Sequence, residues 1–398
     1  MRHTVKYLQN NNNVTRRQFN QGSMAAMIAA GIAPAMIGRA EADEPKKQLG
    51  LAIVGLGGYA TRSIAPEVAA CQHVRLAGVV TGDAEKGKTW AKEHGFEQDA
   101  IYSYDNFDKI ADDDRIDLVH IALPNSMHAE FAIRAAMAGK HVMVEKPMAV
   151  SSGECEKMIA AAKQAGVLLG VNYRLQWEPH HVKATERLAG GAIGDLTNGN
   201  YEFSWSYARA LTGPNKDKVK KWLLDPKMAG GGALFDTGVY PIQAACYLTG
   251  REPVAVRGFP ATRHSDLFPE GIEETMSYEL LFDDGFQALC RASYSQSFHQ
   301  CTTLGPKGSV EILPGQKGSV FGQSGTGNPN PKRLFVNKKE IELKQTLQQA
   351  VLLDAFALAV KNNEKTFKTP GEMGLRDIQI MEKIYESTAK GGLKISLI

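Results

Sequence analysis

Three side chains in two short motifs have the chemistry to transfer a proton together. Lys146 stands in a Glu-Lys-Pro run, and Asp236 and Tyr240 stand in the glycine-rich run 230–240. Because Asp236 and Tyr240 are four positions apart, a helix would project both from one face. An ammonium group opposite a carboxylate and a phenol can remove a hydroxyl proton as hydride departs. The structural alternatives are a surface lysine in a loop, and a helix-terminal acid beside a core tyrosine.

A glycine-rich turn predicts where a dinucleotide would bind. Residues 55–60, Gly-Leu-Gly-Gly-Tyr-Ala, fit the pattern G-x-G-x-x-[GA] directly after an apolar run and before helical spacing resumes. The glycines permit a tight turn and let backbone N–H groups approach a pyrophosphate at a helix N-terminus. The pattern alone is weak evidence, but within a strand–turn–helix context it indicates a dinucleotide-binding domain.

The end of the second predicted strand indicates which dinucleotide is bound. That strand ends in Thr81, whereas an acid at its end would normally bind the ribose 2′-hydroxyl. Asp83 follows two positions later, and Lys86 lies nearby. A hydroxyl and an ammonium group suit a 2′-phosphate, so the sequence favours NADP, with NAD as the alternative. Lys86 could instead be a solvated helix residue.

The elements that must position these residues fall into two groups. Up to about residue 172, apolar strands alternate with helices of 10–15 residues, which predicts βαβ units and a doubly wound parallel sheet. The glycine turn and Lys146 both follow strands, at the edge where such folds bind ligands. The second half is rich in β-branched and aromatic residues joined by short turns. It predicts an α+β domain with a largely antiparallel, open-faced sheet, a helix at about 232–247 and two helices near the C-terminus.

The N-terminus predicts an export signal. Arg16 and Arg17 form a twin-arginine pair, a weakly apolar stretch runs from 24 to 37, and Ala40-Glu41-Ala42 is a small-x-small cleavage site. The stretch is too short for a stable membrane span. We therefore expect export of the folded protein to the periplasm by the twin-arginine machinery. The alternative is a disordered tail with a chance arginine pair. The predicted boundaries are a cleaved signal at 1–42, a Rossmann domain at 43–172, and a substrate-binding and oligomerisation domain at 173–398.

Charge and cysteine content exclude several classes of protein. The formal net charge is +3, but five basic residues and one acid lie in the first 42 positions, so the remainder is nearly neutral. Such a chain has no basic stripe for nucleic acid. The five cysteines are scattered without C-x-x-C spacing, and the odd count argues against a disulfide framework. No cluster of histidine and acidic residues has the spacing of a metal site.

Several motifs, in this order, resemble the Gfo/Idh/MocA oxidoreductases. They are the glycine turn 55–60, Pro124-Asn125-Ser126-Met127-His128, Glu145-Lys146-Pro147, Asn172-Tyr173-Arg174 and the run 230–240. The likeness covers residues 49–398. Most members have histidine at the position of Tyr240, and the tyrosine is similar to the glucose–fructose oxidoreductase branch.

The resemblance implies a set of site residues. It implies that Lys146, Asp236 and Tyr240 are catalytic, and that Thr81 and Lys86 contact the NADP 2′-phosphate. The implied cofactor-binding residues are Gly55, Gly57, Gly58, Tyr59, Thr81, Lys86, Pro124, Asn125, His128, Glu145, Lys146 and Arg174. The implied substrate-binding residues are Lys146, Arg174, Trp222, Asp236 and Tyr240. The resemblance also implies dimers or tetramers that form through the open face of the second sheet.

Together these features predict an exported sugar oxidoreductase with tightly bound NADP(H). It would oxidise an aldose at C1 to a lactone and pass the hydride to a second sugar. One alternative is an NAD(P)-dependent sugar dehydrogenase with exchangeable cofactor. Another is an NAD-dependent glycosidase, whose redox cycle transfers no net electrons. A non-catalytic sugar- or cofactor-binding protein is the rival from another class, and the presence of lysine, aspartate and tyrosine together argues against it.

Overall fold

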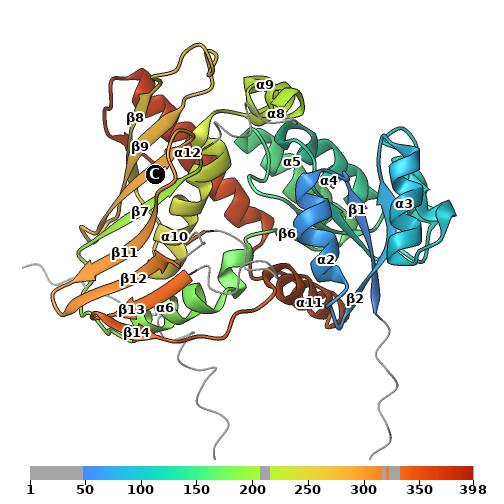
Figure 1. Cartoon of the computed structure of the whole chain (residues 1–398), viewed down its shortest axis with the longest axis horizontal. Coiled ribbons are helices and arrows are strands. Elements are labelled where there is room, and N and C mark those ends of the chain that lie inside the picture. The colour runs from blue at the N-terminus through green and yellow to red at the C-terminus, as the bar shows by residue number, and fades with distance from the viewer. Residues whose placement is uncertain (1–47, 207–215, 316–319, 322–331, 398) are drawn as a thin grey trace, which may run out of the picture. The chain divides into compact units, whose positions relative to one another are not determined.

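The first half of the chain folds into a six-stranded parallel sheet. The computed structural model describes residues 48–206, 216–315, 320–321 and 332–397, so the predicted export signal lies outside the described residues (Figure 1). The strand order is β3-β2-β1-β4-β5-β6, and every neighbouring pair is parallel. The strands are β1 (Leu49–Val54), β2 (Val74–Val80), β3 (Ile101–Tyr102), β4 (Leu118–Ile121), β5 (His141–Val144) and β6 (Leu169–Val171). This arrangement confirms the predicted Rossmann-type sheet.

Local sequence signals set the helices that alternate with these strands. Asp83 caps α3 (Ala84–His94) by accepting from the Lys86 backbone N–H, and Ser151 caps α5 (Ser152–Ala165) in the same way. Both helices end at a glycine in the left-handed conformation. The other helical segments of this half that matter below are η1 (Ala60–Ile64), α2 (Ala65–Val68), η4 (Asn125–Met127) and α4 (His128–Met137).

The second sheet has nine strands in the order β14-β13-β12-β11-β7-β10-β9-β8-β15. Its pairs are antiparallel except for β7 with β10. The strands are β7 (Asn198–Ser204), β8 (Ala255–Ala261), β9 (Thr275–Leu281), β10 (Gln287–Ser293), β11 (His299–Gly305), β12 (Gly308–Pro314), β13 (Lys332–Val336), β14 (Lys339–Ile341) and β15 (Ile395–Ser396). The prediction of a largely antiparallel sheet is therefore confirmed.

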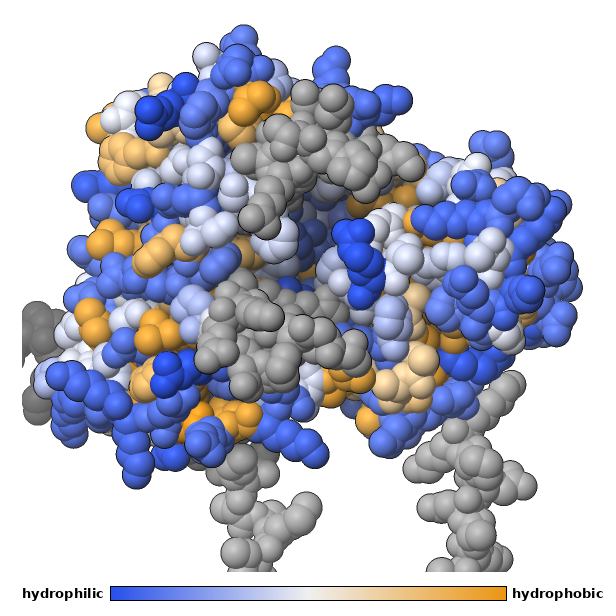
Figure 2. Space-filling view, in the orientation of Figure 1, coloured by the Kyte–Doolittle hydropathy of each residue, from blue (hydrophilic) through white to orange (hydrophobic). Residues whose placement is uncertain are grey.

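Helices cover one face of this sheet and leave the other open (Figure 1). They are α6 (Pro179–Ala189), α10 (Val239–Thr249) and α12 (Gly371–Ala389). In β10 the buried residues Ala288 and Cys290 alternate with the exposed Leu289 and Arg291, as expected for a strand with one solvated face. Apolar side chains are scattered among hydrophilic ones over the part of the surface that contains this sheet (Figure 2).

A C-terminal helix ties the two halves together. The N-terminus of α11 (Gln348–Lys361) lies against α2, where the buried Glu67 carboxylate accepts from the backbone N–H groups of Gln349 at 2.7 Å and Ala350 at 3.3 Å. An acid at a helix N-terminus satisfies donors that the helix itself leaves unpaired. The segment around Gln348 is thereby fixed beside the dinucleotide-binding turn.

Three further observations concern the cysteines, membrane spans and metal sites. All five cysteines are buried and unpaired. In the part of the chain that the structure describes, no helix is long and apolar enough to cross a bilayer. Among the same residues, no group of three or more histidine, cysteine or acidic side chains could hold a metal ion.

Candidate active site

Lys146 and Asp236 form a mostly buried ion pair between the two halves of the structure. Lys146 follows β5, and its Nζ donates to the Asp236 carbonyl at 2.8 Å and to Asp236 Oδ1 at 3.2 Å. The side chains are only 16% and 18% exposed. Burial alone would lower the pKa of the Lys146 ammonium, but Tyr240, Asp236 and Glu145 outweigh burial and raise it above its usual value. The lysine therefore stays charged inside the site.

Tyr240 meets the same lysine from the first turn of α10. The Lys146 Nζ lies 4.9 Å from the centre of the Tyr240 ring, which is cation–π distance. The predicted α-helical spacing of Asp236 and Tyr240 is wrong in detail, because residues Leu234–Gly238 form a π-helical turn (η6) before α10 begins at Val239. π-turns occur frequently at functional sites. Despite the wider turn, both side chains converge on Lys146.

A buried carboxylate from the segment just before β9 holds this turn in place. Glu273 accepts from the N–H groups of Gly232 at 3.0 Å and Leu234 at 2.7 Å, and from the Tyr385 hydroxyl at 2.9 Å. Burial raises the pKa of Glu273. A Cβ on Gly232 would lie 2.3 Å from the Glu273 carbonyl oxygen. Only glycine fits there, so this glycine serves the packing of the turn rather than an approach to a ligand.

A second buried carboxylate orders the strand ends beside Lys146. Glu145 Oε1 lies 3.0 Å from His120 Nε2 and accepts from Asn172 Nδ2 at 2.5 Å. His120 lies in β4, and Glu145 and Asn172 directly follow β5 and β6, so the cluster joins three adjacent strands. Glu145 is thus where the sequence predicted it. His120 was not predicted, although a histidine inside an apolar buried strand was the available signal.

The glycine turn has the geometry that a dinucleotide needs. Gly55 has φ +90°, and a Cβ there would lie 2.6 Å from the Ala122 carbonyl oxygen. A Cβ on Gly57 would meet nothing within 4 Å, so the outer side of the turn is open. A Cβ on Gly58 would lie 2.8 Å from the Arg62 guanidinium. The sequence analysis did not identify Arg62 as a site residue. Its position four residues after the last glycine of the turn was the only indication that the sequence offered.

The end of β2 carries a hydroxyl and a cation. Lys86 Nζ donates to the Leu56 carbonyl within the glycine turn, so this side chain crosses over to the predicted cofactor site. Thr81 is buried, and its Oγ1 accepts from the Asp83 N–H at 3.1 Å. Because the Asp83 carboxylate caps α3, it is directed to the helix backbone at this point. Two cations, Arg62 and Lys86, therefore flank the turn, and the residues present fit a phosphate-rich dinucleotide.

Two of the residues expected to bind cofactor, Asn125 and His128, also make hydrogen bonds within the protein. Pro124 and Asn125 begin the η4 turn after β4, and the Asn125 amide donates to the Ala229 carbonyl at 2.7 Å. The His128 ring nitrogens lie 2.9 Å from the carbonyl oxygens of Pro147 and Leu123. Burial lowers the pKa of His128. The side chains of Asn125 and His128 therefore link the loops around the site.

The remaining predicted residues separate into two places. The Arg174 guanidinium lies 5.8 Å from the Tyr240 ring centre and donates to the Phe321 carbonyl at 2.8 Å and to the Gln348 side chain. Tyr59 is joined to the same region, because its hydroxyl accepts from Gln349 at 2.6 Å. Trp222, on α8 (Lys216–Leu223), packs against a separate small core cluster. Arg174 and Tyr59 therefore belong with Tyr240, whereas Trp222 packs on the cluster that contains Ala233, at the start of the turn that carries Asp236.

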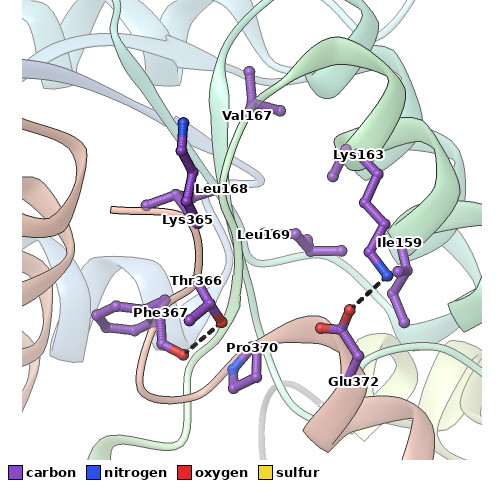
Figure 3. Close-up of a pocket in the computed structure, with 11 residues that line it drawn as sticks. Ile159, Lys163, Val167, Leu168, Leu169, Lys365, Thr366, Phe367, Pro370 and Glu372 are labelled. Carbon is purple, nitrogen blue, oxygen red and sulfur yellow. Dashed lines mark hydrogen bonds and ion pairs between the residues drawn. The ribbon is translucent and has the colours of Figure 1, made fainter. Parts of the chain in front are cut away.

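Two hollows can be compared as candidate sites. A small cavity touches the catalytic candidates and is lined by Lys146, Tyr173, Arg174, Leu175, Val239, Tyr240, Gln243 and Tyr247. A larger groove lies between α5, the start of β6 and the loop before α12; Figure 3 shows the Lys163–Glu372 ion pair across one side of it. This groove is at the amino end of β6, whereas Lys146 follows the carboxyl end of the parallel strand β5. Ligands of open α/β sheets bind at the carboxyl ends, so the first location is the active-site candidate.

Comparison with known proteins agrees with this geometry. Residues 49–173 match the oxidoreductase family with an NAD-binding Rossmann fold, and residues 181–326 match the GFO/IDH/MocA C-terminal domain. The chain is 27% identical to D-xylose 1-dehydrogenase [NADP(+)] of Haloarcula marismortui over 348 residues, 85% of this chain and 90% of that one. It is 30% identical over 262 residues to an uncharacterized oxidoreductase of Rhizobium meliloti, covering 65% of this chain and 73% of the relative.

A solved structure gives the same result. The aldose–aldose oxidoreductase from Caulobacter crescentus, complexed with glycerol, superposes with a TM-score of 0.79 at 36% identity, covering 88% of this chain and all of the other. The glycine turn, the Lys146 motif and the two-sheet architecture thus agree with the matches to both domains. The chain belongs to the Gfo/Idh/MocA oxidoreductase family, with an NAD-binding Rossmann domain followed by the family's C-terminal domain.

Proposed function

We propose that this protein is an NADP-containing sugar oxidoreductase that oxidises an aldose at C1 to a lactone and reduces a second sugar. The observation that carries the proposal is the convergence of Asp236 and Tyr240 on the buried Lys146 ammonium, at the carboxyl edge of the Rossmann sheet. The names of two similar proteins support a sugar substrate, since one is a xylose 1-dehydrogenase and the other an aldose–aldose oxidoreductase.

Tyr240 is the residue best placed to exchange a proton with the sugar. A bound nicotinamide would supply the hydride chemistry that links the donor carbon to the acceptor carbonyl. The Tyr240 phenol oxygen takes the proton of the donor C1 hydroxyl as the lactone forms, and returns a proton to the acceptor oxygen. The Lys146 ammonium lies 4.9 Å from the ring centre, at cation–π distance, and so helps to orient the phenol. Asp236 fixes the ammonium group through two hydrogen bonds.

NADP rather than NAD is supported by charge and hydrogen bonding at the turn. Lys86 and Arg62 supply two cations, Thr81 supplies a hydroxyl at the strand end, and the Asp83 carboxylate is used by the α3 cap. Removing the usual strand-end acid also removes its repulsion of a 2′-phosphate. The purified protein should release mainly NADP(H) on denaturation. Release of NAD(H) alone would contradict the preference and would implicate Asp83 in ribose binding.

The products distinguish the proposed reaction from a plain dehydrogenase, which the xylose dehydrogenase relative favours as second candidate. Purified protein without added cofactor should convert a mixture of two aldoses into equal amounts of a lactone and an alditol, detected by mass spectrometry. A lactone that forms only when NADP is supplied in stoichiometric amounts would support the dehydrogenase. Cleavage of a glycoside without a net redox change would support the glycosidase.

We extend the proposal to the location of the enzyme. The twin-arginine pattern supports export to the periplasm through the twin-arginine machinery, with cleavage after Ala42. Replacing Arg16 and Arg17 by lysine should leave the precursor in the cytoplasm. Normal export of this double variant would refute the assignment.

We also propose assembly into dimers or tetramers through the open face of the second sheet. Phe259 and Leu289 lie on that face and are 47% and 49% exposed. Exposed apolar groups on a broad sheet face favour a protein–protein contact. Charged replacements, Phe259→Lys with Leu289→Glu, should yield monomers in sedimentation. An unchanged mass would place the contact elsewhere.

A further inference from the structure

Two residues from a distant connection reach the active-site candidate. Val320 and Phe321 lie between β12 and β13 in the sequence, and both are fully buried. The Phe321 ring centre lies 6.0 Å from that of Tyr240 and 5.4 Å from that of Phe203. A residue 81 positions beyond Tyr240 in the sequence thus packs beside the phenol that the proposed function uses.

Two buried donors hold this pair of residues by its backbone. Arg174 donates to the Phe321 carbonyl at 2.8 Å, and His181 Nε2 lies 2.8 Å from the Val320 carbonyl oxygen. A carbonyl oxygen can only accept, so Nε2 carries the proton. Burial lowers the pKa of His181 to about 4, which leaves the ring neutral at pH 7. Nδ1 must then accept, and Tyr247, whose hydroxyl is 2.6 Å away, is its donor.

These contacts enclose the Tyr240 ring from several directions. Phe203 packs edge-on at 5.0 Å with an interplanar angle of 81°, and Phe321 packs at 6.0 Å with an angle of 35°. Lys146 and Arg174 lie 4.9 Å and 5.8 Å from the ring centre. Among these neighbours, Phe321 is held by its backbone, because the hydrogen bonds from Arg174 and His181 go to the carbonyl groups of Phe321 and Val320.

We propose that Phe321 is a positioning residue for Tyr240, and that Arg174 and His181 keep it in place through two consecutive carbonyl groups. The inference rests on the proposed function only in using Tyr240 as the acid–base group. It assigns Arg174 a role in constructing the site, beyond contact with cofactor or sugar. It also makes His181, which is fully buried, part of the apparatus that orients the phenol.

Replacing Phe321 by leucine tests the proposal against a matched control. Phe286 is an equally buried phenylalanine that packs against Phe282 and Arg251, so Phe286→Leu reproduces the loss of a buried ring. Both variants should lose similar thermal stability. A misplaced catalytic group costs up to about 100-fold in rate, so kcat of Phe321→Leu should fall roughly 10- to 100-fold while KM changes little. Phe286→Leu should keep the wild-type kcat.

A second readout does not depend on any sugar. Nitration of Tyr240 by tetranitromethane, followed by peptide mass spectrometry, reports how tightly the ring is enclosed. Nitration should be faster in Phe321→Leu than in wild type, and unchanged in Phe286→Leu. If the wild type transforms no sugar, the proposed function fails, but the nitration rates still decide the role of Phe321. Equal nitration of Tyr240 in all three proteins would overturn the positioning role.

His181 gives an independent pair of variants. His181→Gln retains an N–H donor for the Val320 carbonyl, whereas His181→Leu removes it. The glutamine variant should restore slow nitration of Tyr240 and most of kcat relative to the leucine variant. Equal behaviour of the two variants would show that the hydrogen bond to Val320 does not position the phenol.

Discussion

Two glycine-rich segments of this protein look alike in sequence but serve opposite purposes. In the first glycine run, residues 55–58, a Cβ on Gly57 would meet nothing within 4 Å. In the second glycine run, residues 230–232, a Cβ on Gly232 would lie 2.3 Å and 2.5 Å from backbone atoms of Glu273. The first run leaves space for a ligand, and the second lets the Glu273 backbone, just before β9, approach the turn that carries Asp236. A glycine in a sequence therefore indicates that some group comes close to the backbone, and the structure is needed to tell whether that group is a ligand or another part of the protein.

The largest effect should come from the phenol that the second glycine run helps to present. Tyr240→Phe keeps the ring and its packing against Phe203 but removes the hydroxyl. Turnover should fall by about 10²–10⁴-fold, the usual contribution of a general acid or base. The amount of cofactor released on denaturation should stay the same. Wild-type turnover in this variant would remove Tyr240 from the proton relay.

A methyl group in the second glycine run should disrupt packing. Gly232→Ala would force the Glu273 backbone away and weaken its hydrogen bonds to Gly232 and Leu234. Overpacking of this kind costs about 1–3 kcal/mol of unfolding free energy. Denaturant titration measures the loss, and turnover should fall with it. As control, Gly153→Ala adds a Cβ that meets nothing within 4 Å and should not destabilise the fold.

Acid should lower the free energy of unfolding through protonation of His181. Its folded-state pKa is about 4, below the ordinary 6.5, because burial disfavours the imidazolium. The unfolded chain therefore binds a proton that the folded chain excludes as pH falls from about 6.5 to 4. The contribution of His181 to stability is complete above pH 6.5 and is lost across that window, on the order of 3 kcal/mol. Unfolding free energies of wild type and His181→Gln at pH 7.5 and 4.5 measure it; parallel losses in the two proteins would contradict it.

The smallest effect on stability should come from the first glycine run. Gly57→Ala places its methyl group in open space, so the unfolding free energy should change by less than about 0.5 kcal/mol. The same methyl group would stand where a pyrophosphate approaches the turn, so the protein should retain less cofactor. If Gly57→Ala kept all of its cofactor but lost stability, the first glycine run would serve packing rather than ligand binding, which contradicts the account.

The sequence could predict features that follow from spacing along one element. The parallel sheet, the glycine turn at 55–58, Lys146 after β5, and the shared region of Asp236 and Tyr240 were all readable from short motifs. Such features depend on strand and helix periods and on turn chemistry, which are local.

The features that could not be predicted depend on contacts between distant segments. Glu273 holds Gly232 from 41 positions away, and Phe321 packs on Tyr240 from the connection between β12 and β13. The π-helical turn at η6 breaks the helical period that was expected. His128 and Asn125 have the polar groups of cofactor ligands, but packing directs them to backbone carbonyl groups. Three-dimensional packing, which no local pattern encodes, decides each of these cases.

The central claim is that one bound NADP serves two sugars at the Lys146–Asp236–Tyr240 site. The most direct measurement follows the reduced-nicotinamide absorbance of purified protein with no cofactor added. A donor aldose alone should raise this absorbance by one equivalent per site, and a later addition of acceptor sugar should return it to baseline. Tyr240→Phe should slow both phases. If absorbance rises only when NADP is supplied for every turnover, the protein is an ordinary dehydrogenase and the two-sugar account is wrong.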